Sequence, residues 1–263
     1  MPSAKGLALI TGASGGMGLE FAKLAAADGY DLALVARSED KLHAIAADLR
    51  NEHGVDVTVV ALDLAVPSAA DGVFARVPRC DVLVNNAGFA TNGRFEGIEE
   101  SRIEQEIVLD VLTLTNLTRK YLPAMIERKR GKVLNVASTA GMLPGPFMAV
   151  YYASKAYVMS FSQAVAEELR GTGVTVTCFC PGSTQTGFAD RANTNETLLF
   201  KLIPIANAAK MAKAGYDGMK AGKLVVVPWP LFNKIVELSS HVTPRRLLLW
   251  FSRKAVEVES KHA

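Results

Sequence analysis

The sequence has few cysteines, few aromatic residues and little excess of charge of either sign. Its 263 residues include three cysteines, and aromatic residues make up 7% of the chain. Cys178 and Cys180 are two apart in a β-rich run and Cys80 stands alone, which predicts small core residues in a reducing compartment, the cytoplasm, and no disulfide framework. Because 29 Lys and Arg face 26 Asp and Glu, the net charge of +3 gives no support for nucleic-acid binding.

Long hydrophobic runs are also lacking. A membrane-spanning helix needs about 20 largely apolar residues, whereas the apolar runs in the last third of the chain are as short as Leu224–Val227 and Leu247–Phe251. The start of the chain does not resemble a secretory signal, so we expect neither a signal nor a transmembrane segment. Hydrophobic residues make up 49% of the chain and charged residues 21%, which predicts a sizeable core and a single domain over residues 1–263. No metal site is predicted.

Apolar, β-branched runs alternate with longer helical patterns along the chain. Most of the runs lack polar alternation, as expected of strands that are buried on both faces of a parallel sheet. The pattern predicts a doubly wound α/β fold, with a single parallel sheet of about seven strands and helices on both faces. The expected strands are Leu7–Ile10, Leu32–Ala36, Val57–Leu62, Val82–Asn85, Lys132–Ala137, Val174–Phe179 and Leu224–Val227, and the expected helices are Met17–Asp28, Glu39–Glu52, Ser101–Lys129 and Tyr151–Arg170.

Two segments fall outside this alternation. Residues 183–215 carry apolar side chains among polar ones, and we interpret this insertion as a substrate lid because long loops in compact domains are usually functional. Residues 228–263 form a C-terminal extension, for which packing on the surface of the domain is the simpler interpretation. The alternative is a membrane anchor, with Arg245 and Arg246 at lipid headgroups and Leu247–Phe251 inserted.

A glycine-rich turn follows the first expected strand and opens the first expected helix. Glycines let the backbone turn sharply and let an anion come close, while the N–H groups of a helix N-terminus point at that anion. The alternative is a tight strand–helix turn without a ligand. The residues that we expect to contact a pyrophosphate are Gly12, Ser14, Gly15, Gly16, Met17 and Gly18.

The spacing of this turn, Thr-Gly-x-x-x-Gly-x-Gly, resembles that of the short-chain dehydrogenase/reductase family. The resemblance is to NADP-preferring members, similar to ketoacyl and steroid-type carbonyl reductases. It implies a Rossmann fold and an oxidoreductase that transfers a hydride between NADP(H) and a carbonyl group or secondary alcohol. The motifs that carry it, in the family's order between residues 7 and 188, are Asp63-Leu64, Asn85-Asn86-Ala87-Gly88, Ser138, Tyr151-x-x-x-Lys155 and Pro181-Gly182.

Tyr-x-x-x-Lys occurs twice in this sequence, so the motif alone does not locate a site. Tyr151 has Ser138 thirteen residues before it, at the end of an expected strand. Tyr216 begins the second copy and has Ile203 at that offset, so no serine accompanies it. We therefore assign the catalytic pair to Tyr151 and Lys155 and interpret Tyr216 as structural.

The spacing of Tyr151 and Lys155 suits acid–base chemistry. Residues four apart on a helix lie on one face, so Lys155 can place its charge beside the Tyr151 hydroxyl. Lowering a tyrosine pKa from about 10 to about 7 requires roughly 4 kcal/mol of preferential stabilisation of the tyrosinate. A nearby ammonium and a cationic nicotinamide can supply that in a partly desolvated site. Ser138 would hydrogen-bond the substrate oxygen, and the resemblance implies a further bond from Lys155 to the nicotinamide ribose.

Asp110 is a departure from the family's pattern. The family usually has an asparagine in the long helix before the catalytic strand, where its main chain helps to hold a water in a proton relay from the lysine. A carboxylate near Lys155 would stabilise the ammonium and raise the pKa of Tyr151. We therefore expect an active enzyme whose alcohol oxidation is shifted to alkaline pH. The alternative is that Asp110 is a solvated helix residue one turn away from the matching position.

The end of the second expected strand bears on the choice of cofactor. Ala36 is neutral and Arg37 can pair with a 2′-phosphate, which favours NADP(H), whereas an acidic residue would favour NAD. Relaxed cofactor use with a solvated Arg37 is the alternative. The resemblance implies that the other residues in contact with the cofactor are Asp63, Leu64, Asn86, Ala87, Gly88, Tyr151, Lys155, Pro181, Gly182 and Thr186.

Apolar residues are expected along the cleft, which predicts a small hydrophobic carbonyl substrate. Because cellular NADPH is usually kept reduced, reduction of an apolar ketone or ketoacyl group is the expected direction. The resemblance also implies a homodimer or homotetramer in which the two long helices pair between subunits. A different class of function, an NADP-binding regulatory protein of the same fold without turnover, is the alternative. The cleft residues are Phe89, Phe95, Met142, Leu143, Phe147, Phe188 and the 198–203 segment.

Overall fold

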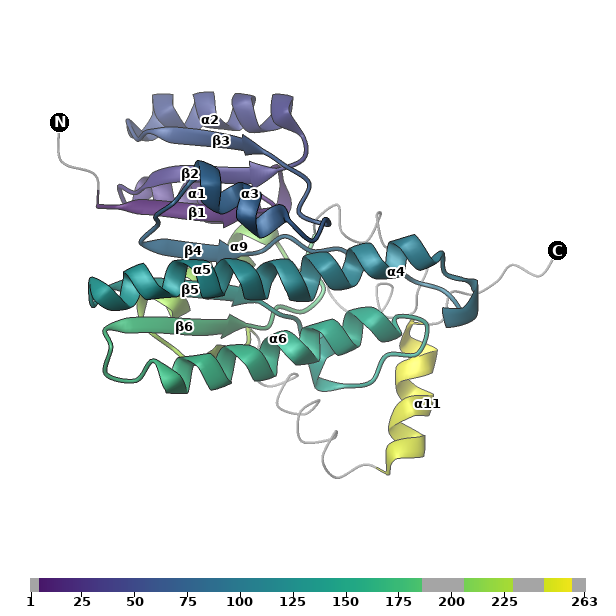
Figure 1. Cartoon of the computed structure of the whole chain (residues 1–263). Coiled ribbons are helices and arrows are strands. Elements are labelled where there is room, and N and C mark those ends of the chain that lie inside the picture. The colour runs from purple at the N-terminus through teal and green to yellow at the C-terminus, as the bar shows by residue number, and fades with distance from the viewer. Residues whose placement is uncertain (1–4, 186–205, 229–243, 257–263) are drawn as a thin grey trace.

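Seven parallel strands form one sheet in the order β3-β2-β1-β4-β5-β6-β7 (Figure 1). The computed structural model describes residues 5–185, 206–228 and 244–256. The predicted doubly wound α/β fold with a single parallel sheet is confirmed, and all seven strands lie within one residue of the expected bounds at each end. The strands are β1 (Leu7–Thr11), β2 (Asp31–Ala36), β3 (Val57–Ala61), β4 (Val82–Asn85), β5 (Gly131–Val136), β6 (Val174–Phe179) and β7 (Val225–Val226).

Helices cover both faces of the sheet. Figure 1 shows α5 and α6 on one face, with α1 and α9 on the other. Four further helices of the described residues, α2, α3, α4 and α11, and two short 3-10 turns, η1 and η3, join these. The bounds are α1 (Gly16–Ala27), α2 (Glu39–His53), α3 (Ala69–Arg76), η1 (Phe95–Gly97), α4 (Glu100–Ile107), α5 (Leu114–Glu127), η3 (Thr139–Met142), α6 (Ala149–Glu168), α9 (Ala208–Lys220) and α11 (Arg245–Val256).

The long helix predicted over Ser101–Lys129 has a widened middle. Its first part is α4 and its last part is α5, and between them the segment η2 (Val108–Thr113) is a π-helix. The three segments follow one another without a break. A π-helical turn is rare, is found often at functional sites and changes which residues share a helix face. Asp110 lies in the middle of η2 and is buried.

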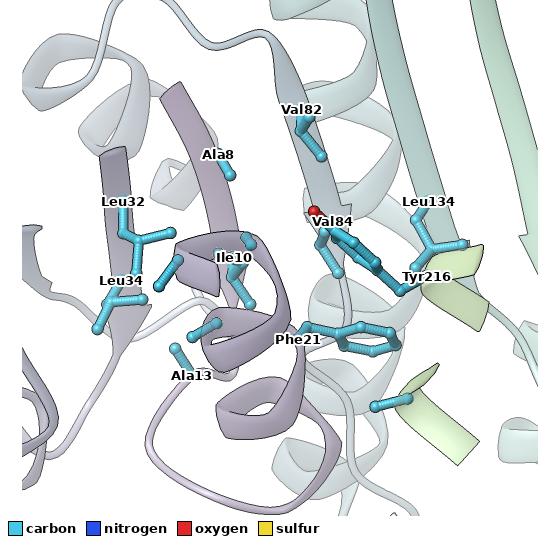
Figure 2. Packing of buried hydrophobic residues seen from close by; sticks show 14 of the residues in the cluster. Ala8, Ile10, Ala13, Phe21, Leu32, Leu34, Val82, Val84, Leu134 and Tyr216 are labelled. Atoms are coloured by element: carbon cyan, nitrogen blue, oxygen red, sulfur yellow. The ribbon is translucent and has the colours of Figure 1, made fainter. Parts of the chain in front are cut away.

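The core lies on both faces of the sheet because successive strand residues point in opposite directions. Ala8 and Ile10 of β1 pack on one face with Phe21 of α1, as Figure 2 shows. Leu9, between them, packs on the other face with Tyr121 of α5. Both faces of the central strands are therefore apolar, which is why the sequence runs lack polar alternation.

The strand order fixes where a ligand can bind. After β1 the chain returns through α1 to β2 on one side, and β4 lies on the other side of β1. Such a switch point leaves a crevice at the carboxyl ends of the strands, where open α/β sheets bind their ligands. The motifs singled out in the sequence follow the carboxyl ends of β1, β2, β3, β4, β5 and β6.

The predicted lid and extension are described only in part. Residues 186–205 lie outside the described residues, whereas residues 208–215 belong to α9, which packs on α1. In the extension, α11 is held to the loop before α6 by a hydrogen bond from Ser252 Oγ to the Pro144 carbonyl at 2.6 Å. Among the described residues, no helix combines the length and the apolar character that crossing a bilayer requires. The lid, the extension and the single domain stay predictions.

Candidate active site

The glycine-rich turn leaves open space in front of the N-terminus of α1. A Cβ on Gly18 would lie 2.1 Å from the Gly12 carbonyl oxygen, whereas a Cβ on Gly15 would meet no described atom within 4 Å. Gly12 adopts a positive φ of 69°. No side chain of the described residues caps α1, and its first turn carries no acidic residue. The open space and the positive helix end therefore fit the pyrophosphate of a dinucleotide. Ser14 and Met17 are half-buried in the same turn.

Thr11 connects this turn to the segment after β4. Its Oγ1 accepts hydrogen bonds from the N–H groups of Asn86 at 2.9 Å and Ala87 at 3.0 Å. The Asn86 side-chain amide donates to the Thr11 carbonyl at 2.9 Å. A Cβ on Gly88 would lie 2.9 Å from Asp110 Oδ1. The backbone can therefore pass close to Asp110 at this position because Gly88 has no side chain. Thr11 was not among the predicted site residues, although a hydroxyl at the last strand position is a readable signal.

Three residues predicted to contact the adenosine half follow β2 and β3. Arg37 is exposed directly after β2, beside the buried Ala36. Asp63 is exposed after β3, and its Oδ1 accepts a hydrogen bond from the Ala65 N–H at 2.9 Å. The Leu64 side chain is buried in the core, and its carbonyl accepts a hydrogen bond from Thr113 Oγ1 at 2.9 Å. A ligand would therefore meet Leu64 through its main chain.

Ser138, Tyr151 and Lys155 come together beside the carboxyl end of β5. Ser138 precedes η3, and its Oγ accepts a hydrogen bond from the Ala140 N–H at 3.1 Å. Tyr151 and Lys155 lie in the first two turns of α6, and the Lys155 Nζ is 5.5 Å from the centre of the Tyr151 ring. Ser138 and Tyr151 share a side-chain hydrogen bond. The spacing argument thus placed these side chains together correctly.

Asp110 forms a buried ion pair with Lys155. The Lys155 Nζ lies 3.0 Å from Asp110 Oδ2, and the side chains are 6% and 0% exposed. The Phe89 N–H donates to Asp110 Oδ1 at 3.3 Å. The alternative of a solvated Asp110 is wrong, because the π-helical segment carries this residue inward beneath Gly88.

Burial and charge act against each other on these groups. Burial raises the pKa of Tyr151, and the charge of Asp110 raises it further, while the charge of Lys155 lowers it. The net effect is a tyrosine pKa above its usual value. Burial acts to lower the pKa of Lys155, but the charges of Asp110, of an ionised Tyr151 and of Glu106 together oppose it, and that pKa lies above its usual value. The tyrosine therefore keeps its proton at neutral pH, and Lys155 stays an ammonium.

Glu106 is a site residue that the sequence reasoning missed. It is 0% exposed and lies one turn before Asp110 on α4. Its Oε2 accepts hydrogen bonds from the Thr91 N–H at 3.0 Å and the Thr91 Oγ1 at 2.6 Å. Burial raises the pKa of Glu106 to about 7, the Asp110 charge acts in the same direction, and the hydrogen bonds from Thr91 oppose both. The spacing of four residues from Asp110 was its only signal in the sequence.

A buried amide network holds the helices behind the site. The Asn85 Nδ2 donates to Thr118 Oγ1 of α5 at 3.1 Å and to Asn135 Oδ1 of β5 at 2.9 Å. The Asn135 Nδ2 donates to Ser162 Oγ of α6 at 3.0 Å. These bonds join two strands and two helices in the interior, where unpaired amides would be costly. They fix α6, and with it Tyr151, against the sheet.

The wall next to Tyr151 is apolar. Ala90 and Met148 are buried together with Tyr151 and Tyr152, and Phe147 packs against them with a positive φ of 66°. Of the residues predicted after β6, Pro181 is buried and its carbonyl accepts a hydrogen bond from the Thr139 N–H at 3.0 Å, while Gly182 is exposed. Thr186, Phe188 and residues 198–203 lie outside the described residues.

Comparison with known proteins identifies close likenesses in sequence and in structure. The model of the family described as short chain dehydrogenase matches residues 6–197. The very-long-chain 3-oxoacyl-CoA reductase of Rattus norvegicus is 33% identical over 180 residues, which cover 66% of this chain and 58% of that protein. The chain thus spans less than two thirds of the length of this curated relative.

Two solved structures share nearly the whole fold. A short-chain dehydrogenase from Sphingobium yanoikuyae in complex with NADPH has a TM-score of 0.81 and 31% identity, covering 98% of both chains. A 7β-hydroxysteroid dehydrogenase has a TM-score of 0.82 and 26% identity, covering 94% of this chain and 96% of that one.

Proposed function

Because the chain belongs to the short-chain dehydrogenase family, we propose that it is an oxidoreductase that transfers a hydride between NADP(H) and a carbonyl group or secondary alcohol. The observation that carries the proposal is the half-buried Ser138 together with the buried Tyr151 and Lys155 at the carboxyl edge of the sheet. Asp110 joins this set through Lys155. A regulatory protein without turnover would have no need of a buried acid–base pair, whose desolvation is costly.

The cofactor is NADP(H), which would supply the hydride when bound. The N-terminus of α1 and the open space beside Gly15 hold the pyrophosphate. Arg37 pairs with the 2′-phosphate, since its guanidinium matches a phosphate in geometry and charge. The NADPH in the similar Sphingobium structure supports this choice. Asp63 with the Leu64 main chain would meet the adenosine half, and the further contacts would come from Asn86, Ala87, Gly88, Pro181 and Gly182; the contact predicted for Thr186 lies outside the described residues.

The chain's own groups handle the substrate oxygen and its proton. Ser138 donates a hydrogen bond to the carbonyl oxygen and holds it next to the Tyr151 hydroxyl. Because the pKa of Tyr151 is raised by burial, its hydroxyl carries a proton at neutral pH and can give it to the oxygen as charge develops there. Lys155 stabilises the tyrosinate that this transfer leaves behind and would hydrogen-bond the ribose of the cofactor. The arrangement favours reduction of a ketone.

The substrate is an apolar ketone or ketoacyl compound. The apolar wall of Ala90, Phe147 and Met148 beside Tyr151 supports this. The relatives act on compounds of this kind by name, a very-long-chain 3-oxoacyl-CoA in one case and a 7β-hydroxysteroid in the other.

The test is NADPH consumption with a panel of hydrophobic ketones and ketoacyl thioesters. Tyr151→Phe should abolish turnover while NADPH binding, followed by fluorescence titration, remains. Tyr152→Phe is the matched control, since Tyr152 is the adjacent buried tyrosine, and it should retain turnover. Absence of turnover in the wild type across the panel, with NADPH bound, would favour the regulatory protein instead.

The cofactor preference is tested at Arg37. Arg37→Asp should weaken NADPH binding far more than NADH binding, because the carboxylate would repel the 2′-phosphate and accept bonds from a ribose hydroxyl. The two titrations on one variant control for any loss of folding. An equal loss of both affinities contradicts the assignment of Arg37.

The subunits associate through the faces of α4, η2 and α6. An open apolar hollow of about 360 Å³ lies there, lined by Ile107, Val111, Ala153 and Tyr157 among others. Ile107 is 44% exposed, and covering such a patch is the usual role of an interface. A homodimer or homotetramer in the cytoplasm is therefore part of the proposal, and the three free, buried cysteines are compatible with a reducing compartment. Light scattering of the wild type and Ile107→Asp tests the association, which the charge should weaken.

Membrane association through the C-terminal extension is a second candidate. On α11, Leu247 and Trp250 are 47% and 54% exposed, and Arg246 and Lys254 are exposed on the same helix. An amphipathic basic helix of this kind can lie in a lipid interface. Flotation of the full chain with anionic liposomes, beside Trp250→Glu, decides between this anchor and packing on the domain. Equal flotation of the two removes the anchor.

A further inference from the structure

Glu106 is a buried carboxylate that the proposed reaction does not use. Its side chain is held from one side, where Thr91 donates two hydrogen bonds to Oε2. The other oxygen, Oε1, has no hydrogen-bond partner among the described residues and is shielded from solvent. A fully buried carboxylate with a bare oxygen is unfavourable when ionised, because it has lost its water without gaining a donor.

The charged groups that face Glu106 come from the elements packed around it. Asp110 of η2 and Lys155 of α6 both act on its charge, and Tyr151 of α6 in turn feels Glu106. Arg102, one turn earlier on α4, is exposed and lies over the Phe89 ring, 4.7 Å from its centre. Thr91 is uncharged. The Lys155 ammonium is thus the one buried positive group beside two carboxylates among these side chains, and it is paired with Asp110, whose Oδ2 lies 3.0 Å from the Lys155 Nζ.

We propose that Glu106 is a positioning residue that acts through the Asp110–Lys155 pair, so that the proton on its carboxyl sets how strongly Lys155 favours ionisation of Tyr151. With Glu106 protonated, the three buried side chains of Glu106, Asp110 and Lys155 together carry no net charge. With Glu106 ionised, the same three side chains carry one net negative charge, which disfavours tyrosinate at Tyr151. The inference deepens the proposed function and rests on it, since Tyr151 is the acid and base of that reaction.

The direction of the effect differs for the two directions of the reaction. Reduction uses the protonated Tyr151, so ionised Glu106 leaves the acid in its working form. Oxidation of an alcohol needs tyrosinate, so ionised Glu106 delays the rise of oxidation to higher pH. One proton on a residue outside direct contact with the substrate would therefore bias the enzyme towards reduction above neutral pH.

The catalytic test compares pH profiles of kcat/KM for alcohol oxidation. Glu106→Gln keeps the shape of the side chain and removes its charge, and it should move the alkaline inflection to lower pH by about one unit, the order expected when a unit charge is removed from the buried group around Tyr151. Glu104→Gln on the same helix is the control, because Glu104 is exposed, and it should leave the profile in place. Thr91→Val removes the hydroxyl that donates to Glu106 and should therefore raise the pH at which Glu106 ionises. Its effect on the profile should appear at pH values below the alkaline inflection.

A second measurement needs neither substrate nor cofactor. Because burial raises the pKa of Glu106 to about 7, from about 4.3 in an unfolded chain, the folded protein binds this proton more tightly. The resulting stability is present below about pH 4.3 and is lost as pH rises through about 7. The wild type should therefore lose thermal stability over this window relative to Glu106→Gln, and the gap in Tm between them should widen from pH 5 to pH 8.

The two measurements separate the failures. A widening Tm gap with a shifted oxidation profile supports the inference. A widening gap with an unshifted profile shows a buried proton that does not reach Tyr151, and it overturns the inference, as does a constant gap. Failure of the proposed function is a different result, namely no carbonyl turnover in the wild type and no effect of Tyr151→Phe.

Discussion

The two Tyr-x-x-x-Lys copies of this chain have nearly the same internal geometry. In α6 the Lys155 Nζ lies 5.5 Å from the centre of the Tyr151 ring, and in α9 the Lys220 Nζ lies 5.6 Å from the centre of the Tyr216 ring. Each lysine also pairs with one carboxylate from another helix, Asp110 in the first case and Asp28 in the second. Spacing on a helix therefore sets the local pair and nothing beyond it.

The surroundings separate the two copies. The Tyr216 hydroxyl donates to Asp28 Oδ2 at 3.2 Å, where α1 ends, and Lys220 is 45% exposed. That place is the edge at which the strands begin, because α1 runs back from the carboxyl end of β1. Tyr151 lies at the opposite edge, next to Ser138, with a lysine only 6% exposed. The same motif thus joins two helices in one place and, in the proposed reaction, supplies an acid–base pair in the other, and the contact of Tyr216 with Asp28 agrees with its interpretation as structural.

Among substitutions in the two copies of the motif, those at the lysines are expected to differ most in their effect on kcat/KM. Lys155→Met should reduce kcat/KM for ketone reduction by about 100-fold or more, since the tyrosinate loses its stabilising charge. Lys220→Met removes a partly exposed ion pair, which contributes little, and should leave kcat/KM unchanged. Steady-state kinetics of both variants measure this. Equal losses would mean that the ammonium acts through folding and not at the site.

A smaller effect is expected at the carboxylates. Asp110→Asn removes the charge that raises the pKa of Tyr151, so the alkaline inflection of alcohol oxidation should move to lower pH by about one to two units. The pH–rate profiles of wild type, Asp110→Asn and Asp28→Asn measure this. Asp28→Asn makes the same change beside the other tyrosine and should not move the profile. Identical profiles for wild type and Asp110→Asn would dismiss any charge effect of this residue.

The fold and the edge that carries the site could be predicted because their signals are local. Gly12 and Gly18 stand where the backbone demands them, and buried strands such as β4 are continuous apolar runs. Residues that follow parallel strands must meet at one edge of the sheet, so Ser138 and Arg37 could be placed there without coordinates. Helix spacing then brings Tyr151 beside Lys155.

What could not be predicted depends on contacts between distant segments. Glu106, unlike the predicted Asp110, was missed because it lies in the site only where α4 passes into a π-helix and packs against the loop that carries Thr91. Nothing in the spacing of a regular helix indicates such a turn. Helix α3 was missed because only eight residues form it. The Asn85 network, too, arises only when β4, β5, α5 and α6 are packed together.

The smallest effect is expected at the Tyr216 hydroxyl, whose removal should change only the free energy of unfolding. Tyr216→Phe keeps the ring in the core with Phe21 and Leu134 (Figure 2) and removes only the hydroxyl that donates to Asp28. The free energy of unfolding should fall by about 1 kcal/mol, the usual net value of one such hydrogen bond, as denaturant titration would measure, with turnover intact. Loss of turnover at unchanged stability would reverse the assignment of the two copies. If both tyrosines respond as expected, the same substitution abolishes turnover at Tyr151 and lowers only the free energy of unfolding at Tyr216. Function in this chain therefore follows from the charges and burial around the motif.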